Sequence, residues 1–152
     1  LGNPGRSGGG GLLRDCHGGF LFGFSCCFGI TMSLHAELRA LVYGVRQCVA
    51  RGYTQLHLEV DSLTLVQILS GGHACPWRLQ VEVDELLRFQ SLVRSITHCW
   101  REANQPADRL AKLGAIRRDA VFFDSFDSLP LMARGEIRMD KLGVPSFRRR
   151  RA

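Results

Sequence analysis

The sequence lacks the features that would place the chain in a membrane or in a disulfide-stabilised secreted fold. It contains no run of about 20 apolar residues, the length that a membrane-spanning helix needs. Its six cysteines show no Cys-x-x-Cys spacing and no regular framework suited to zinc or to disulfides. We therefore expect free thiols, no membrane partner and an intracellular location, in the nucleus or the cytoplasm.

Outside the C-terminal end, basic and acidic residues nearly balance. The formal net charge is +6, and residues 134–152 account for +5 of it, with seven basic and two acidic side chains. With 152 residues, 45% of them hydrophobic, the chain can form one domain with a core but not two. We predict a domain at residues 1–116 and a loosely ordered basic extension at 117–152. The run of arginines near its end could serve as a nuclear address or a nucleic-acid tether.

The order of the predicted elements indicates an α/β domain. Apolar residues at steps of three and four predict helices, and alternation of apolar with polar residues predicts strands. The opening residues 1–11 are rich in glycine and favour a turn. In chain order we predict strands at 9–14 and 20–28, a helix at 33–51, a strand ending at 61, helices at 62–69 and 78–90, a strand at 92–100, and a helix from 104 to about 114.

Three acidic residues, Glu37, Asp61 and Asp108, stand at the ends of predicted elements. Carboxylates that gather in one place repel each other unless a divalent cation neutralises them. Mg²⁺ suits such a site because it takes oxygen ligands, and two ions could bridge a scissile phosphate. Spacing alone is weak evidence, since an acidic residue at a helix start also interacts well with the helix dipole. Asp61-Ser62 could equally be a helix N-cap.

Several separate motifs occur together in this chain. They are residues 35–41 (HAELRAL), 58–62 (LEVDS) and 98–111 (HCWREANQPADRLA), preceded by Asn3-Pro4-Gly5, the glycine run and Arg14-Asp15. In this order and at these intervals they closely resemble the plant ribonuclease H-like domain that is related to non-LTR retrotransposon polyproteins. The resemblance extends from Leu1 to about Ala115.

The resemblance implies a mixed five-stranded sheet flanked by helices, and metal-dependent cleavage of the RNA strand in RNA/DNA hybrids. Glu37, Asp61 and Asp108 fall on three of the family's four acidic positions, which hold Mg²⁺ or Mn²⁺. The fourth is an aspartate on the first, central strand, which would lie ahead of the Asn3-Pro4-Gly5 turn. We therefore expect the fold without its central strand and with impaired catalysis. Asp15 is no substitute, because the order of elements puts it in the next turn.

A second function is open to the same residues, since a domesticated retroelement remnant could bind nucleic acid or a protein without cutting. A response to magnesium separates the two functions. His98 lies inside a predicted strand and is expected to be structural, and the sequence leaves the oligomeric state open. Candidate contacts to phosphates or sugar hydroxyls, each with an ordinary turn or capping role as well, are Asn3, Gly5, Ser62, Arg101 and Asn104.

Overall fold

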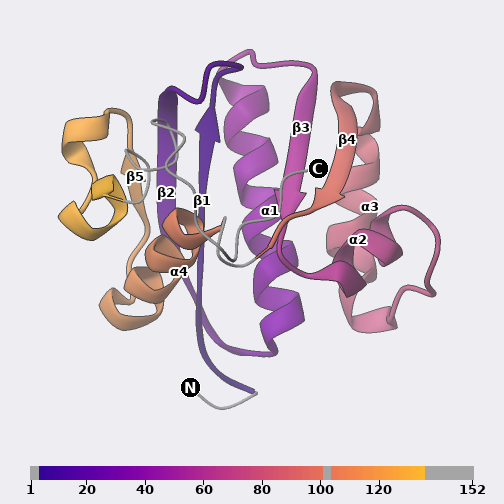
Figure 1. Ribbon diagram of the computed structural model, residues 1–152. Coiled ribbons are helices and arrows are strands. Elements are labelled where there is room, and N and C mark those ends of the chain that lie inside the picture. The colour runs from indigo at the N-terminus through magenta and orange to yellow at the C-terminus, as the bar shows by residue number, and fades with distance from the viewer. Residues whose placement is uncertain (1–3, 101–103, 136–152) are drawn as a thin grey trace.

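The structure is a computed structural model that describes residues 4–100 and 104–135. Its elements follow the predicted order, strand, strand, helix, strand, helix, helix, strand, helix, with one short strand added at the end (Figure 1). The strands are β1 (Gly5–Arg14), β2 (Phe20–Thr31), β3 (Leu56–Val60), β4 (Val93–His98) and β5 (Val121–Phe123). The helices are α1 (Ser33–Ala50), α2 (Leu63–Leu69), α3 (Gln80–Arg88) and α4 (Gln105–Arg117), with the 3₁₀ turns η1 (Trp77–Leu79), η2 (Gln90–Leu92) and η4 (Phe126–Ser128).

The strands form two sheets rather than one. In the three-stranded sheet β2 pairs antiparallel with both β1 and β5, whereas β3 and β4 form a parallel pair. β1 and β3 run in opposite directions in Figure 1. Among the described residues, no strand is hydrogen-bonded to β1 on the side away from β2, or to β3 on the side away from β4. This split agrees with the expected ribonuclease H-like sheet without its central strand.

The glycine run at the start of the chain lies within β1, which begins at Gly5, four residues ahead of the predicted strand at 9–14 and inside the predicted turn. A Cβ atom at Gly8 or Gly10 would overlap the backbone of Ala111 in α4, and a Cβ atom at Gly9 would crowd Ala40 in α1. Because successive residues of a strand face opposite sides, α4 and α1 cover the two faces of β1. Only glycine leaves room for α4 to lie directly on the backbone of β1 at these positions. This tertiary packing overrides the local tendency of glycine to form a turn.

Most of the buried side chains form one core around the inner face of α1. Leu38 and Val45 of α1 pack with Phe24 of β2, with Val60 of β3 and with Leu65 of α2, all of them buried. The spacing of Leu38, Val42 and Val45 is the helical period from which the sequence predicted this element. Since this core includes residues of both sheets, α1 holds the two sheets together.

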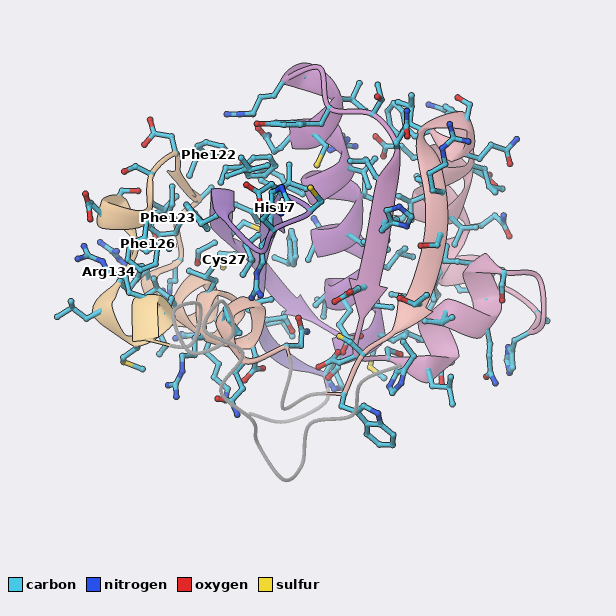
Figure 2. The ribbon with its side chains drawn as sticks, turned by 45° about the horizontal axis from the view of Figure 1, so that its top comes forward. His17, Cys27, Phe122, Phe123, Phe126 and Arg134 are labelled. Carbon is cyan, nitrogen blue, oxygen red and sulfur yellow. The ribbon has the colours of Figure 1, made fainter. Side chains whose placement is uncertain are left out.

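A second, smaller core lies on the outer side of β2. Leu110 of α4 packs there with Phe123, Leu129 and Ala133, and Figure 2 shows Phe123, Phe126 and Arg134 together in this part of the molecule. The sequence assigned residues 117–152 to a loose extension, but its described part, up to residue 135, is packed on the domain. A three-residue strand is too short to show a periodic pattern, and β5 is defined only by its pairing with β2.

The six cysteines are all free thiols, as expected. Only Cys26 and Cys48 are buried, while Cys16 is exposed and the other three are partly buried. In the part of the chain that the structure describes, no helix has the length and apolar character needed to cross a membrane.

Candidate functional site

A cavity of about 1090 Å³ lies between β1 and β3. One wall is formed by residues 8–15, which belong to β1 and the turn after it, and the opposite wall by residues 54–61, which include β3. The inner face of α1 and the first turns of α4 complete the lining. We call this space the β1–β3 groove. It lies where the two sheets face each other, with no strand of residues 4–100 or 104–135 between them, so elements far apart in the sequence meet along it.

The three carboxylates singled out in the sequence all line the β1–β3 groove. Glu37 is near the start of α1, and its Oε2 atom is shielded from solvent. Asp61 directly follows β3, and Asp108 lies in the first turn of α4 with its Oδ2 atom 2.9 Å from Nζ of Lys112. The structure therefore brings Glu37, Asp61 and Asp108 to one surface, from three different elements.

Contacts from neighbouring elements hold two of these carboxylates in position. Nε2 of His98 lies 3.2 Å from the backbone oxygen of Asp61, and the Cys99 amide donates to the Val60 carbonyl at 2.9 Å. His98 is thus the structural residue that its place in a strand predicted. At the start of α1, two residues before Glu37, Nε2 of His35 lies 2.7 Å from Oε1 of Glu82 in α3.

The carboxylates share the groove without forming a ready-made metal site. Among the residues that the structure describes, no three His, Cys, Asp or Glu side chains are placed so that they could hold a metal ion. Their oxygen atoms are the ligand type that Mg²⁺ prefers, but their present arrangement does not gather them. The donor chemistry therefore fits the expected metal, although no cluster of three such side chains is preformed among the described residues.

The end of the groove near Asp61 has a negative electrostatic character. Burial, and after it the charges of the nearby carboxylates Glu59 and Asp61, raise the pKa of the Cys99 thiol to about 12. Glu59 also lines the groove, facing the same side of β3 as Asp61. Across the groove, burial lowers the pKa of Arg14 and the charge of Glu59 opposes this shift. The alternation of residues 57, 59 and 61 is the sequence signal that could have identified Glu59.

Of the candidate substrate contacts, one caps a helix, one lines the groove, one begins a strand and two lie outside the described residues. Ser62 is the N-cap of α2, where its Oγ accepts from the Leu65 amide at 3.2 Å, so its hydroxyl has a structural role. Asn104 occupies the N-cap position of α4, but its side chain makes no capping hydrogen bond, and it lines the groove. Gly5 begins β1 opposite Thr31. Asn3 and Arg101 lie outside the described residues.

Asp15 has a turn role that explains its presence next to the groove. Its Oδ1 atom accepts hydrogen bonds from the amides of His17 at 2.9 Å and Gly19 at 2.7 Å, which closes the turn between β1 and β2. Gly18 in the same turn has a φ of 79°, in the left-handed region. Asp15 therefore stabilises the hairpin turn in which the order of the elements placed it.

Comparisons with known proteins agree with this geometry. A family model described as reverse transcriptase-like matches residues 2–114. Over 97% of its length the chain is 37% identical to an Arabidopsis thaliana protein named as a ribonuclease H protein, and it spans 24% of the length of that relative. The chain therefore belongs to the reverse transcriptase-like family of ribonuclease H-like domains.

Solved structures show the same fold. The RNase H1 of the archaeon Halobacterium salinarum superposes with a TM-score of 0.72 at 25% identity, covering 77% of this chain and 91% of that one. LC11-RNase H1, solved in complex with an RNA/DNA hybrid, superposes with a TM-score of 0.72 at 22% identity, with the same coverage of 77% and 91%. The second likeness shows the fold alone.

Proposed function

We propose that this chain is the nuclease-type domain of a hydrolase that binds RNA/DNA hybrids and cleaves their RNA strand with Mg²⁺ or Mn²⁺. The observation that carries this proposal is the position of Glu37, Asp61 and Asp108, which reach one groove from three elements. Membership of the ribonuclease H-like family and the ribonuclease H name of the plant relative support the choice of substrate.

Glu37, Asp61 and Asp108 are the proposed metal ligands and catalytic residues of this domain. A divalent ion held there would activate a water molecule and stabilise the leaving oxygen. The resemblance implies a fourth acidic ligand besides these three, and we propose that catalysis with the three alone is impaired. Asn104, which lines the groove, and Ser62, Gly5, Asn3 and Arg101 are proposed contacts to the nucleic-acid backbone.

The test is cleavage of a labelled RNA/DNA hybrid with Mg²⁺, comparing the original chain with Asp61→Asn. We expect weak cleavage that falls about tenfold or more in the variant, because a lost charged ligand weakens metal binding. Asp124→Asn is the matched control, since Asp124 is exposed and lies outside the groove. Cleavage that survives Asp61→Asn would remove the proposed site.

Metal binding can be measured without any cleavage. Mn²⁺ broadens the NMR signals of nuclei close to it, so a titration should selectively broaden the amide signals near Glu37, Asp61 and Asp108. The Asp61→Asn variant should need a higher Mn²⁺ concentration for the same broadening. Broadening spread evenly over other acidic residues, such as Asp84 and Asp119, would contradict a metal site in the groove.

One observation favours a second function, a module that binds nucleic acid or a protein without cutting. No ready-made carboxylate cluster exists among the described residues, and a binding module does not need one. Hybrid binding that is unchanged by Mg²⁺, together with no cleavage, would select this function.

The free state of the six cysteines supports the proposed nuclear or cytoplasmic location.

A further inference from the structure

Large apolar side chains are exposed at the edge of the two-stranded sheet where Asp61 lies. Trp100, two residues after the end of β4, is 48% exposed, and Leu63, two residues after Asp61, is 54% exposed. β3 and β4 are parallel neighbours, so the residues that follow them lie at one edge of the sheet (Figure 1). Ligands of α/β sheets bind at the carboxyl ends of parallel strands. Apolar surface gathered at this edge therefore indicates a ligand with an apolar face.

Backbone hydrogen bonds connect Trp100 to the segments that carry two of the proposed metal ligands. The amide of the preceding residue donates to the carbonyl of Val60, directly before Asp61, at 2.9 Å. The Asn104 amide donates to the Trp100 carbonyl at 3.2 Å, and the Asp108 amide donates to the Asn104 carbonyl at 3.0 Å. Trp100 therefore lies at the rim of the candidate site, next to the place where a substrate of the carboxylates would bind.

The indole ring of Trp100 is held in position by His98. The two ring centroids are 5.5 Å apart at an interplanar angle of 74°, an edge-to-face contact. His98 is itself held, since its Nε2 atom lies 3.2 Å from the backbone oxygen of Asp61. About half of the Trp100 surface stays open to solvent. A ring that is already positioned loses little conformational freedom when a flat ligand stacks on it.

The flat ligand that a nucleic-acid substrate offers is a base. Within the paired part of a hybrid each base is stacked between its neighbours, so a side chain at the protein surface reaches the flat face of a base only where the base is unpaired. Aromatic side chains stack on unpaired bases with little regard to sequence, because every base has a π face. Trp100 therefore suits an unpaired base and not the paired region.

We propose that Trp100 is a stacking platform for an unpaired RNA base next to the hybrid, with Leu63 extending its apolar surface. The substrate is then a hybrid whose RNA strand continues beyond the paired region as a single strand. This inference rests on the proposed function, since the carboxylate site is what brings nucleic acid to this edge of the sheet.

The test compares hybrids whose RNA strand carries an unpaired extension of about four nucleotides, either with bases or with abasic sites, at each end in turn. Fluorescence anisotropy of a fluorescein label on the DNA strand measures binding, without added metal so that no cleavage intervenes. At one of the two ends the extension with bases should bind about tenfold more tightly than the abasic one. Equal binding at both ends would overturn the proposal, because only the sugar–phosphate chain would then contribute.

Substitutions assign the preference for bases to one side chain. Trp100→Leu stays apolar but loses the aromatic face, so it should bind both extensions equally, whereas Trp100→Phe should keep part of the preference. Trp77→Leu is the matched control, since Trp77 is 81% exposed and lies in η1, outside the groove. A preference that survives Trp100→Leu, or that is lost in Trp77→Leu, would contradict the assignment to Trp100.

Fluorescence gives a readout that does not depend on the folding of Trp100→Leu. The chain has two tryptophans, so Trp77→Phe leaves Trp100 as the single emitter. Its emission should be quenched by the extension with bases and not by the abasic one. Absence of quenching, or absence of saturable binding by every probe, would refute the platform.

The platform and the nuclease proposal can fail separately. A chain that cleaves hybrids in a manner dependent on Asp61 but shows no preference for bases in the extension loses only the platform. A chain that prefers extensions with bases but does not cleave keeps the platform and loses the nuclease function.

Discussion

The two sheets of this domain differ in how closely the helices approach the strands. In the three-stranded sheet, α4 lies on the backbone of β1 at Gly8 and Gly10, and its own Gly114 lies against the backbone of Cys26. In the two-stranded sheet, Leu56 and Val60 of β3 reach the rest of the core through ordinary side-chain packing. In the three-stranded sheet the helix packs directly on strand backbone, whereas in the two-stranded sheet the strand packs through its side chains.

This difference bears directly on the candidate site. Asp108 belongs to α4, whose position is determined by the glycine contacts, whereas Asp61 belongs to the two-stranded sheet on the other side of the groove. The carboxylates come from the two halves, and α1, which supplies Glu37, connects them. The distance between Asp61 and Asp108 therefore depends on how the two sheets are held across the groove, where no described strand lies.

The largest expected effect tests the backbone contact. A Cβ atom at Gly10 would overlap backbone atoms of α4, which cannot move aside as a flexible side chain can. Gly10→Val should lower the free energy of unfolding by about 3 kcal/mol or more, at the upper end of overpacking effects. Urea denaturation measures it. Gly135→Val is the control, since nothing lies within 4 Å of a Cβ atom there. If both variants are equally stable, the close packing of α4 on β1 does not depend on the glycines.

An intermediate effect compares one thiol from each half. Burial raises the pKa of Cys26 in β2 to about 11, and burial followed by the carboxylates Glu59 and Asp61 raises that of Cys99 to about 12. Folding therefore favours the protonated thiols. Their contribution to stability is complete below the ordinary pKa of 9.0 and is lost as the pH rises through 11 and 12.

The contribution of Cys99 can be isolated by substitution. Between pH 9 and pH 11 the original chain should lose on the order of 1–2 kcal/mol more stability than Cys99→Ala, since a shift of one pKa unit corresponds to about 1.4 kcal/mol. Urea midpoints at pH 8, 9, 10 and 11 measure the difference. Parallel pH curves for the two proteins would show that the thiol near Asp61 is not held in its protonated form.

The smallest effect concerns side-chain contacts between helices on the two-stranded side. Arg46 of α1 makes a two-pronged contact with Glu85 of α3, with N–O distances of 2.5 and 2.6 Å. The Arg46 side chain is 55% exposed, so the pair should contribute less than about 1 kcal/mol. Glu85→Gln should change stability by no more than that at pH 7.

The stabilisation by the Arg46–Glu85 pair should depend on pH, and the pKa of Glu85 gives the direction of that dependence. The hydrogen bond from Arg46 lowers the pKa of Glu85 below its usual value of 4.5. The stabilisation is therefore present above pH 4.5 and is lost as the pH falls through the lowered pKa. Thermal unfolding at pH 7 and at pH 3 should show a larger difference between the original chain and Glu85→Gln at pH 7 than at pH 3. A large difference at both values would indicate a packing role.

Sequence reasoning succeeded where the signal is local. The spacing of Leu38, Val42 and Val45 predicted α1 to within one residue of its observed end, and alternation predicted a strand that leads into Asp61. It was less successful with Asn104, which stands at the predicted cap position of α4 but makes no side-chain capping bond. A residue type predicts a possible hydrogen bond, while its formation depends on the surrounding backbone.

The sequence by itself determined the helices, the order of the elements and the acidic residues at their ends, because periodicity and capping act between residues close in the chain. Only the tertiary structure decided that β1 begins as early as Gly5, that residues 121–123 pair with β2, and that a groove separates β1 from β3. These features arise from contacts between segments far apart in the sequence, such as Gly10 with Ala111, and no local pattern encodes them.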